Sequence, residues 1–244
     1  MFGFRNSKKI LKTFSKNYSI QLLSSMKNNS INIFCFHGKP CAGKDSQAER
    51  LAEQFSNSII ISTGEIFRGA KTKEGKFGKY YEALKEDIEI VNAGGLIRDH
   101  VIVKIVGEVI KDYISEGKRT FLFTGFPRTI PQAKEFNTML DGLKNNYDTN
   151  EKHIFLKVSN KIAEERAQRR REKDILRNRI PRKEDEPTSF SKRLADFKKF
   201  TLPMIEQIGE TKKVITLNSI KTKDEVFVEI LTSLGLIRSF KERR

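Results

Sequence analysis

Five short apolar runs, separated by longer amphipathic segments, constrain the fold of this chain most strongly. The runs are INIFCF (31–36), SIIIS (58–62), TFLFTGF (120–126), HIFLKV (153–158) and KVITL (213–217). Near-continuous Ile, Phe, Val and Leu is typical of strands that are buried on both faces of a parallel sheet. Helical patterns cover about 44–56, 64–92 in pieces, 98–116, 130–145, 160–172, 187–209 and 222–236. This alternation predicts one α/β domain with a doubly wound, parallel five-stranded sheet flanked by helices.

The turn after the first run predicts a phosphate-binding loop. Gly38, Gly43 and Lys44 have the spacing G-x-x-x-x-G-K and lie between a predicted strand and a predicted helix. Glycines let backbone N–H groups close around phosphate oxygens, and the helix N-terminus adds its positive dipole end. A chance glycine-rich turn is the alternative for this loop taken alone. The loop interpretation places phosphate against Gly38, Gly43, Lys44, Asp45 and Ser46.

Five motifs, in order, resemble those of the adenylate kinase family of nucleoside monophosphate kinases. They are HGKPCAGKDSQ, ISTGEIFR, GGLIRDHVI, FTGFPRTIPQA and RKEDEPTSFSKRL, and they cover the chain from about 31 to 236. The resemblance implies a P-loop fold and reversible phosphoryl transfer from a nucleoside triphosphate to a nucleoside monophosphate, with Mg²⁺ as cofactor. It divides the chain into an extension (1–30) and a kinase domain (31–244), which carries a helical monophosphate-binding insertion (62–97) and a short lid (171–184) without zinc-binding cysteines.

The resemblance also implies a role for individual residues. Cationic side chains would surround the transferred phosphoryl group, because guanidinium forks grip phosphate oxygens in pairs. These catalytic residues are Lys44, Arg128, Arg166, Arg170, Arg182 and Arg193. The monophosphate and its base would contact Thr63, Arg68, Gly95, Leu96, Ile97, Gly125, Arg128 and Gln132. Thr63 and Gln132 match the adenylate-selecting members, so AMP is the expected acceptor; ATP is the expected donor, with GTP left open.

Three residues depart from the family's pattern. Thr124 stands where the family has an aspartate that orients water around magnesium, Asp45 replaces a glycine after Lys44, and Cys41 replaces a loop glycine. One hypothesis is that the magnesium-holding carboxylate has moved to Asp45. The alternative is an aspartate that complements the helix dipole in a decayed site. Cys41 is either a tolerated small residue or an oxidisable thiol with a lowered pKa.

Two further function classes follow from these departures and from the net charge of +16. A nucleotide-binding relative without useful catalysis would act as a sensor or an assembly partner. Nucleic-acid binding is the other class, because the chain from residue 31 onward still carries +10. The phosphate-site matches account for much of that charge, and no aromatic stacking ladder is present. We therefore expect a monomer with ATP and AMP as partners and neither nucleic acid nor membrane.

Residues 1–30 contain six basic and no acidic side chains and are rich in Ser, which is typical of a transit peptide for the mitochondrion or another organelle. A disordered basic tail on a cytoplasmic protein is the alternative. No apolar run approaches the length that spans a bilayer.

The remaining polar residues carry weaker expectations. The two cysteines and three histidines have no zinc spacing, and each histidine (His37, His100 and His153) is expected to be an ordinary surface or strand-end residue. The charged tract 169–187 is expected to be a mobile loop.

Overall fold

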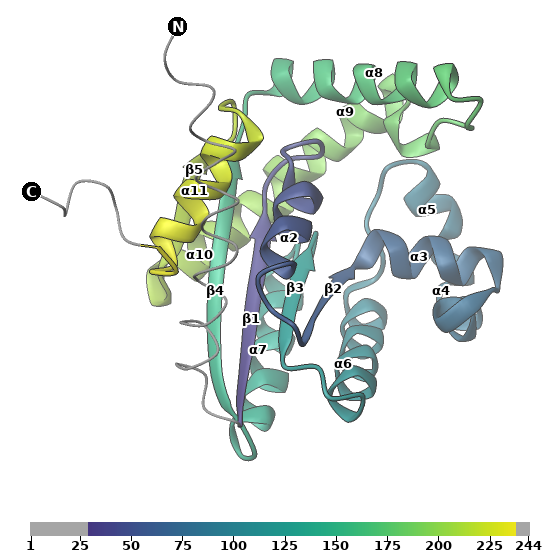
Figure 1. Cartoon of the computed structure of the whole chain (residues 1–244). Helices are drawn as coiled ribbons and strands as arrows, with labels where there is room; N and C mark the ends of the chain where they lie inside the picture. Colours follow the sequence, from purple (N-terminus) through teal and green to yellow (C-terminus); the bar gives the residue numbers. More distant parts are fainter. Residues whose placement is uncertain (1–28, 238–244) are drawn as a thin grey trace, which may run out of the picture.

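A parallel five-stranded sheet lies at the centre of the structure, a computed structural model that describes residues 29–237 (Figure 1). The strand order is β2-β3-β1-β4-β5, and every neighbouring pair is parallel. The strands are β1 (Ser30–His37), β2 (Ser58–Ser62), β3 (Thr120–Thr124), β4 (Asp148–Lys157) and β5 (Val214–Asn218). The predicted sheet is confirmed; β4 begins earlier than its apolar run, because polar residues from Asp148 onward extend the pairing with β1.

Strand β1 is the central strand and fixes where the site is built. Cys35, near its end, lies opposite Phe123 of β3 and His153 of β4. Because all strands run the same way, their carboxyl ends meet at one edge of the sheet, where ligands bind in open α/β folds. The chain leaves β1 at His37 and β3 at Thr124 on this edge.

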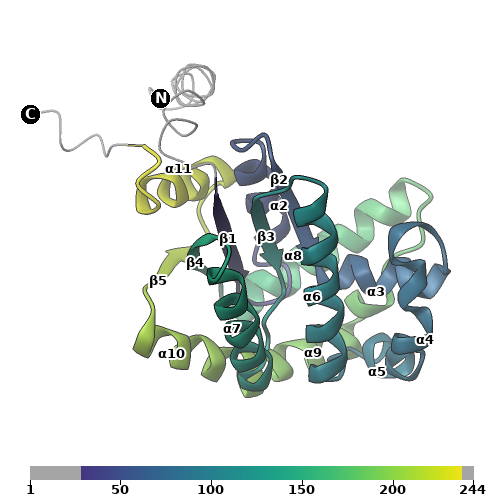
Figure 2. The ribbon, with the colours of Figure 1, turned by 90° about the horizontal axis from the view of Figure 1, so that it is seen from below.

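Helices cover both faces of the sheet. Figure 2 shows α2 and α11 on one face and α6, α7 and α10 on the other. The helices are α2 (Lys44–Ala52), α3 (Thr63–Thr72), α4 (Tyr81–Leu84), α5 (Ile88–Asn92), α6 (Asp99–Ser115), α7 (Ile130–Lys144), α8 (Asn160–Leu176), α9 (Pro187–Asp196), α10 (Leu202–Thr211) and α11 (Lys223–Ser233). Shorter 3-10 turns are η1 (Gly75–Tyr80), η2 (Lys85–Asp87) and η3 (Lys183–Asp185), and η4 (Phe197–Thr201) is a π-helical segment. No helix in this part of the chain is long and apolar enough to cross a membrane.

Apolar side chains pack against both faces of the strands. On the α6 and α7 face, Phe123 and Phe136 are almost fully buried; on the α2 and α11 face, Phe36 and Ile230 are fully buried. Burying one such side chain stabilises the fold by about 1.5–3 kcal/mol. The central strands are thus covered by apolar layers on both faces.

The predicted insertion forms a small helical unit beside the sheet, made of α3 to α5 (Figure 1). Its return to α6 is fixed by Asp87, which is fully buried and accepts from the backbone N–H of Arg98 at 3.0 Å. The Arg98 guanidinium also donates to Asp87 at 3.1 Å. One buried carboxylate therefore closes the base of the insertion.

The charged tract 169–187 corrects the prediction of a mobile loop. Helix α8 continues through it to Leu176, and η3 and α9 occupy most of its second half, which leaves a short connection over 177–182. Arg170 on α8 forms an ion pair with the buried Asp185 of η3. That contact anchors the charged end of α8. No apolar periodicity in the sequence predicts a helix there.

Candidate active site

The loop between β1 and α2 has the shape of a phosphate cradle. Gly38 and Gly43 have φ values of 143° and 97°, in the left-handed region that favours glycine. A Cβ on Gly38 would lie 2.6 Å from the carbonyl oxygen of Leu156, so the loop passes against β4 only without a side chain there. Lys44 Nζ donates to the carbonyls of Gly38 at 3.0 Å and Lys39 at 2.8 Å. The loop therefore curls around its own lysine.

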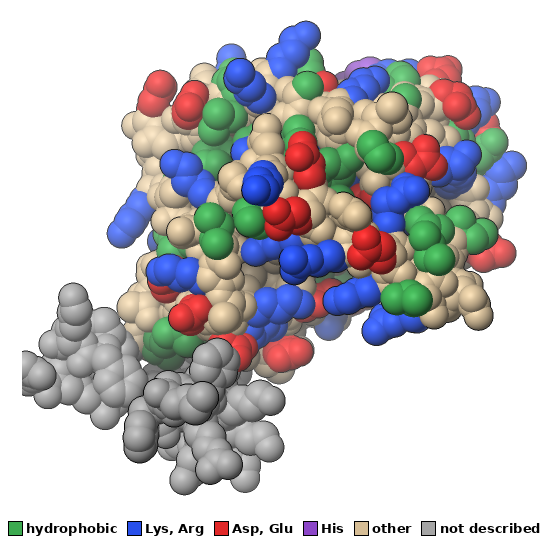
Figure 3. Space-filling view, turned by 90° about the horizontal axis from the view of Figure 1, so that it is seen from above, with side chains coloured by type: hydrophobic (Ala, Val, Ile, Leu, Met, Phe, Trp, Pro, Cys, Tyr) green, Lys and Arg blue, Asp and Glu red, His purple; other side chains and the backbone are tan. Residues whose placement is uncertain are grey.

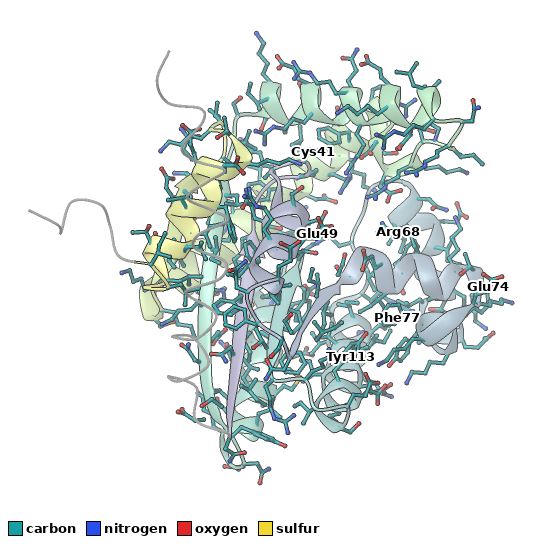
Figure 4. The ribbon with its side chains drawn as sticks, in the orientation of Figure 1. Cys41, Glu49, Arg68, Glu74, Phe77 and Tyr113 are labelled. Carbon is teal, nitrogen blue, oxygen red and sulfur yellow. The ribbon has the colours of Figure 1, made fainter. Side chains whose placement is uncertain are left out.

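A cleft above this loop collects most of the predicted cations. It has about 760 Å³ of space between its walls, open solvent included, and its lining contains Lys44, Arg68, Arg128, Arg170, Arg182 and Arg193. Figure 3 shows this end of the molecule, where Lys and Arg side chains lie interspersed with Asp and Glu. Figure 4 shows Cys41 on the loop above α2 and Arg68 on the α3 side. The predicted cations other than Arg166 are thus brought together from α2, α3, the turn after β3, and the segment from α8 to α9.

Crowding of these cations shifts their pKa values. Burial, and then the nearby Arg128 and Arg193, lowers the pKa of Lys44 to about 8, although Asp45 acts in the opposite direction. Burial, and then Arg193, lowers the pKa of Arg128 to about 10. Each additional positive charge is therefore unfavourable here, and a polyanion in the cleft would relieve that repulsion.

Two acidic residues that the sequence analysis did not assign hold this cage in place. The Asp185 carboxylate, almost fully buried, accepts from Arg170 and, at 3.2 Å, from Arg193. Glu184 lines the cleft and lies 3.4 Å from the Arg68 guanidinium. Both residues belong to the motif RKEDEPTSFSKRL. Their position between two predicted site arginines was the sequence feature that could have identified them.

A second cavity, lined by Thr63, Ile97, Gly125, Arg128 and Gln132, adjoins the cleft. Gly95 and Leu96 also belong to its wall. Since Gly125 and Arg128 line both spaces, the second cavity opens into the cleft beside the arginines. Thr63 Oγ1 donates to the Gly125 carbonyl at 3.1 Å, which ties the insertion to the end of β3.

Arg166 and Ser46 are absent from the described residues that line the cleft. Arg166 lies behind the loop, where its guanidinium donates to the carbonyls of Cys41 at 3.3 Å and Ser219 at 2.6 Å. Its structural position is that of a loop support, which differs from the predicted contact with the phosphoryl group.

Cys41 lines the cleft with a φ of 59°, so a side chain occupies a conformation that suits glycine. Burial raises the pKa of its thiol, although Arg170 lowers it. The hypothesis of a lowered thiol pKa is therefore wrong, because desolvation outweighs the neighbouring cations.

Asp45 and Thr124 lie in the lining of the same cleft. Thr124 is 3% exposed, and its hydroxyl has no hydrogen-bond partner among the described residues. Asp45 is exposed at the start of α2 and forms no ion pair in this part of the chain. An exposed carboxylate and an unpartnered hydroxyl in one cleft are oxygen donors of the kind that Mg²⁺ and its water ligands require.

One of the three histidines, His153, corrects the expectation of ordinary surface or strand-end residues, because it is buried inside β4; His37 ends β1 as expected, but it is also buried. His37 and His153 are both 2% exposed and contact each other, Nε2 to Nδ1, at 2.9 Å, whereas His100 is exposed as expected. Donor atoms of Cys35, Glu151 and His153 also lie within 4.8 Å of one another. Glu151 and His153 use these atoms in hydrogen bonds and form a hydrogen-bonded cluster with His37 and Lys212. Cys35 lies beside this cluster as a thiol, because burial raises its pKa well above the usual value.

Comparison with known proteins extends over these same elements. A sequence model of the family described as adenylate kinase matches residues 36–213. An adenylate kinase from Agrobacterium fabrum is 30% identical over 191 residues, which cover 78% of this chain and 91% of that protein. One from Brucella anthropi is 31% identical over 193 residues, covering 79% of this chain and 93% of its own length. One from Hyphomonas neptunium is 28% identical over 204 residues, covering 84% and 98%.

Proposed function

Because the chain belongs to the adenylate kinase family and is a nucleoside monophosphate kinase that transfers phosphoryl groups between nucleotides, we propose that ATP is its donor and AMP its acceptor. The products of this reversible reaction are two molecules of ADP. The observation that carries the proposal is the gathering of six cationic side chains in one cleft beside a phosphate loop. No contact among the described residues favours the alternative of an inactive relative.

The two adjoining cavities suggest how the substrates are held. The triphosphate lies along the loop, with Lys44 against its outer phosphates, and the monophosphate lies in the cavity that Thr63, Ile97 and Gln132 line. Arg128 lines both cavities and stands between the reacting groups. Two nucleotides held in line in this way supply much of the rate enhancement, since phosphoryl transfer needs little covalent work from the protein.

The arginines of the cage stabilise charge on the moving phosphoryl group. Arg170 and Arg193 share the Asp185 carboxylate, so their guanidinium planes are oriented before substrate binds. Arg182, on the connection after α8, is exposed and belongs to the proposed lid, 171–184. Closure of this short segment would exclude water and bring Arg182 onto the donor.

Magnesium fits the oxygen donors of the cleft. Asp45 and the unpartnered hydroxyl of Thr124 would hold the ion, directly or through its water ligands, on the loop side of the phosphates. When bound there, Mg²⁺ neutralises negative charge on the phosphate oxygens. This assignment follows the hypothesis that the carboxylate has moved from the end of β3 to the start of α2.

The decisive experiment supplies the chain with Mg-ATP and, in turn, AMP, CMP, UMP or GMP, and follows ADP formation with and without magnesium. We expect magnesium-dependent turnover with the highest kcat/KM for AMP. Substitution of GTP for ATP tests the donor. Nucleotide binding without turnover by any acceptor would overturn the proposal.

Residues 1–28 lie outside the described part of the chain, so the transit-peptide interpretation of residues 1–30 remains a prediction. The relatives reported above are bacterial proteins and give organelle import no support. An N-terminus near Ser30 on the protein isolated from its cells would support import; Met1 would contradict it. The proposal of a monomer is tested by sedimentation of the full chain with and without nucleotide.

A further inference from the structure

A chain of buried polar side chains begins directly behind the phosphate loop. His37, the last residue of β1, contacts His153 of β4 at 2.9 Å, and the two rings stack with centroids 5.2 Å apart. His153 Nε2 lies 2.8 Å from one oxygen of the Glu151 carboxylate. The other oxygen accepts from Lys212, directly after α10, which also donates to Asn137 of α7 at 2.8 Å. The contacts lead from the end of β1, through Glu151 and His153 of β4, to the partly exposed Lys212.

The chemistry of these groups gives the hydrogen bonds a direction. Burial alone would raise the pKa of Glu151, but hydrogen bonds from His153 and Lys212 outweigh burial and lower it, so this group is a carboxylate at neutral pH. A carboxylate accepts only, and therefore His153 must donate from Nε2. If the Nε2 proton is the only one on the His153 ring, Nδ1 accepts, and the donor to it is His37 Nε2–H.

The same logic leaves His37 with an unprotonated Nδ1. Burial, followed by His153 and Lys44, lowers the pKa of His37 well below its usual value, so the ring is neutral. His37 lines a cavity at the loop together with Lys44, Arg128, Arg193 and Asp196. An unprotonated Nδ1 adds no positive charge to this set of cations, whereas a second proton on the ring would make it a cation that repels them.

The orientation of the His37 ring affects the phosphate loop because the loop begins at the next residue. Gly38 follows His37 directly, and its carbonyl is one of the two that Lys44 contacts. Cys35, two residues before His37 on the same face of β1, is buried against the cluster and holds its proton. Fixing the His37 ring therefore fixes the strand end from which the loop departs.

We propose that Glu151 and His153 are positioning residues of the phosphate loop, because their hydrogen bonds select the tautomer and the ring orientation of His37. The proposal rests on the nucleotide site described above and adds to it two residues on β4 that line none of the nucleotide cavities in the described structure. They act through His37 and affect the affinity of the phosphate loop for the triphosphate.

The test compares the full chain with its E151Q variant. Glutamine keeps the shape of Glu151, but its amide both donates and accepts, so it no longer dictates which nitrogen of His153 carries the proton. The matched control is E135Q, which makes the same chemical change on the exposed face of α7. Nitrogen NMR of the imidazoles reports each tautomer directly; the chain has three histidines, and exposed His100 serves as the internal reference.

In the unsubstituted chain at pH 7–8, we expect His37 and His153 both to be protonated at Nε2. In E151Q, signals of the Nδ1–H tautomer should appear, and the Kd for ATP, measured by titration without acceptor, should rise about two- to tenfold, the equivalent of one hydrogen bond. E135Q should change neither quantity.

Protonation of His37 at Nδ1 in the unsubstituted chain would overturn the proposal. So would unchanged tautomers or unchanged ATP affinity in E151Q. Absence of turnover in the unsubstituted chain, together with weaker ATP binding by E151Q, would refute the proposed kinase reaction and leave the positioning role standing.

Discussion

At the scale of single residues, the amide of Gln132 is held in one orientation, which under the proposed function would present a fixed edge to the acceptor base. Gln132 Oε1 accepts from the backbone N–H of Arg128 at 2.8 Å, and Gln132 Nε2 donates to Asp99 at 2.8 Å. Thr129 donates to the same Asp99 oxygen at 2.9 Å. Because a carboxylate only accepts, Asp99 fixes which end of the amide faces which way. The sequence predicted Gln132, but not Asp99, whose role depends on a contact across α6 and α7.

The variant Asp99→Asn should weaken this selection. An asparagine can also donate, so the Gln132 amide can turn over, and a wrongly presented edge leaves a polar group unpaired. We expect the KM for AMP to rise roughly tenfold and the preference for AMP over CMP to shrink. Asp141→Asn, an exposed change on α7, is the control. An unchanged ratio of kcat/KM for the two acceptors would show that Asp99 does not orient the amide.

The variant Asp45→Ala tests the magnesium assignment. Removal of the carboxylate should lower kcat about 100-fold at saturating nucleotide and raise the magnesium concentration needed for half-maximal rate. Thr124→Asp, introduced into the same variant, should restore much of the loss, because it returns a carboxylate to the neighbouring wall of the cleft. Glu49→Gln, farther along α2 (Figure 4), is the control. Full magnesium-dependent activity in Asp45→Ala would refute the relocation of the carboxylate.

At the scale of elements, the phosphate loop is held by contacts that lie far from it in the sequence. Gly38 passes against the carbonyl of Leu156 on β4, and Arg166 of α8 donates to the Cys41 carbonyl from behind. The G-x-x-x-x-G-K spacing predicted the loop correctly. It could not predict that Arg166 supports the loop, since the resemblance places an arginine in the region of the lid without giving the direction of its side chain.

The variant Gly38→Ala should separate the loop from β4. Its Cβ would lie 2.6 Å from a backbone oxygen, and φ at this position is unfavourable for any residue with a side chain. We expect ATP affinity to fall at least tenfold, while AMP, in the neighbouring cavity, binds within about twofold of its original affinity. Gly142→Ala, on α7 with open space around it, is the control. Equal loss of both affinities would indicate general unfolding, which thermal denaturation would detect.

At the scale of the whole molecule, the sequence predicted the layers better than the polar contacts between them. A strand that is buried on both faces needs apolar residues at successive positions, so an apolar run predicts such a strand. All five strands appear where such runs occur. The end of α8 was missed because an ion pair between Arg170 and Asp185, rather than an apolar stripe, anchors it. The His37–His153 pair was missed for a similar reason: the order of strands, which brings β4 beside β1, is a property of the assembled sheet.

Stability of the whole domain should depend on pH through His37. Its pKa is lowered in the folded state, so the unfolded chain binds more protons, and the free energy of unfolding falls as pH drops below about 6.5. The slope is at most about 1.4 kcal/mol per pH unit for one proton. Urea denaturation at pH 7.5 and 5.5 measures it. His37→Gln should flatten the dependence, and His100→Gln, at an exposed site, should leave it unchanged; equal slopes in all three proteins would contradict the assignment.

The acidic residues of η3 compete with any anionic ligand for the arginines of the cleft. Glu184 and Asp185 already occupy guanidinium groups of Arg68, Arg170 and Arg193, so an incoming nucleotide meets arginines that have partners. Binding then exchanges one anion for another, so a ligand binds only if it interacts with the arginines more strongly than the two carboxylates do. A polyphosphate meets that condition at several oxygens at once.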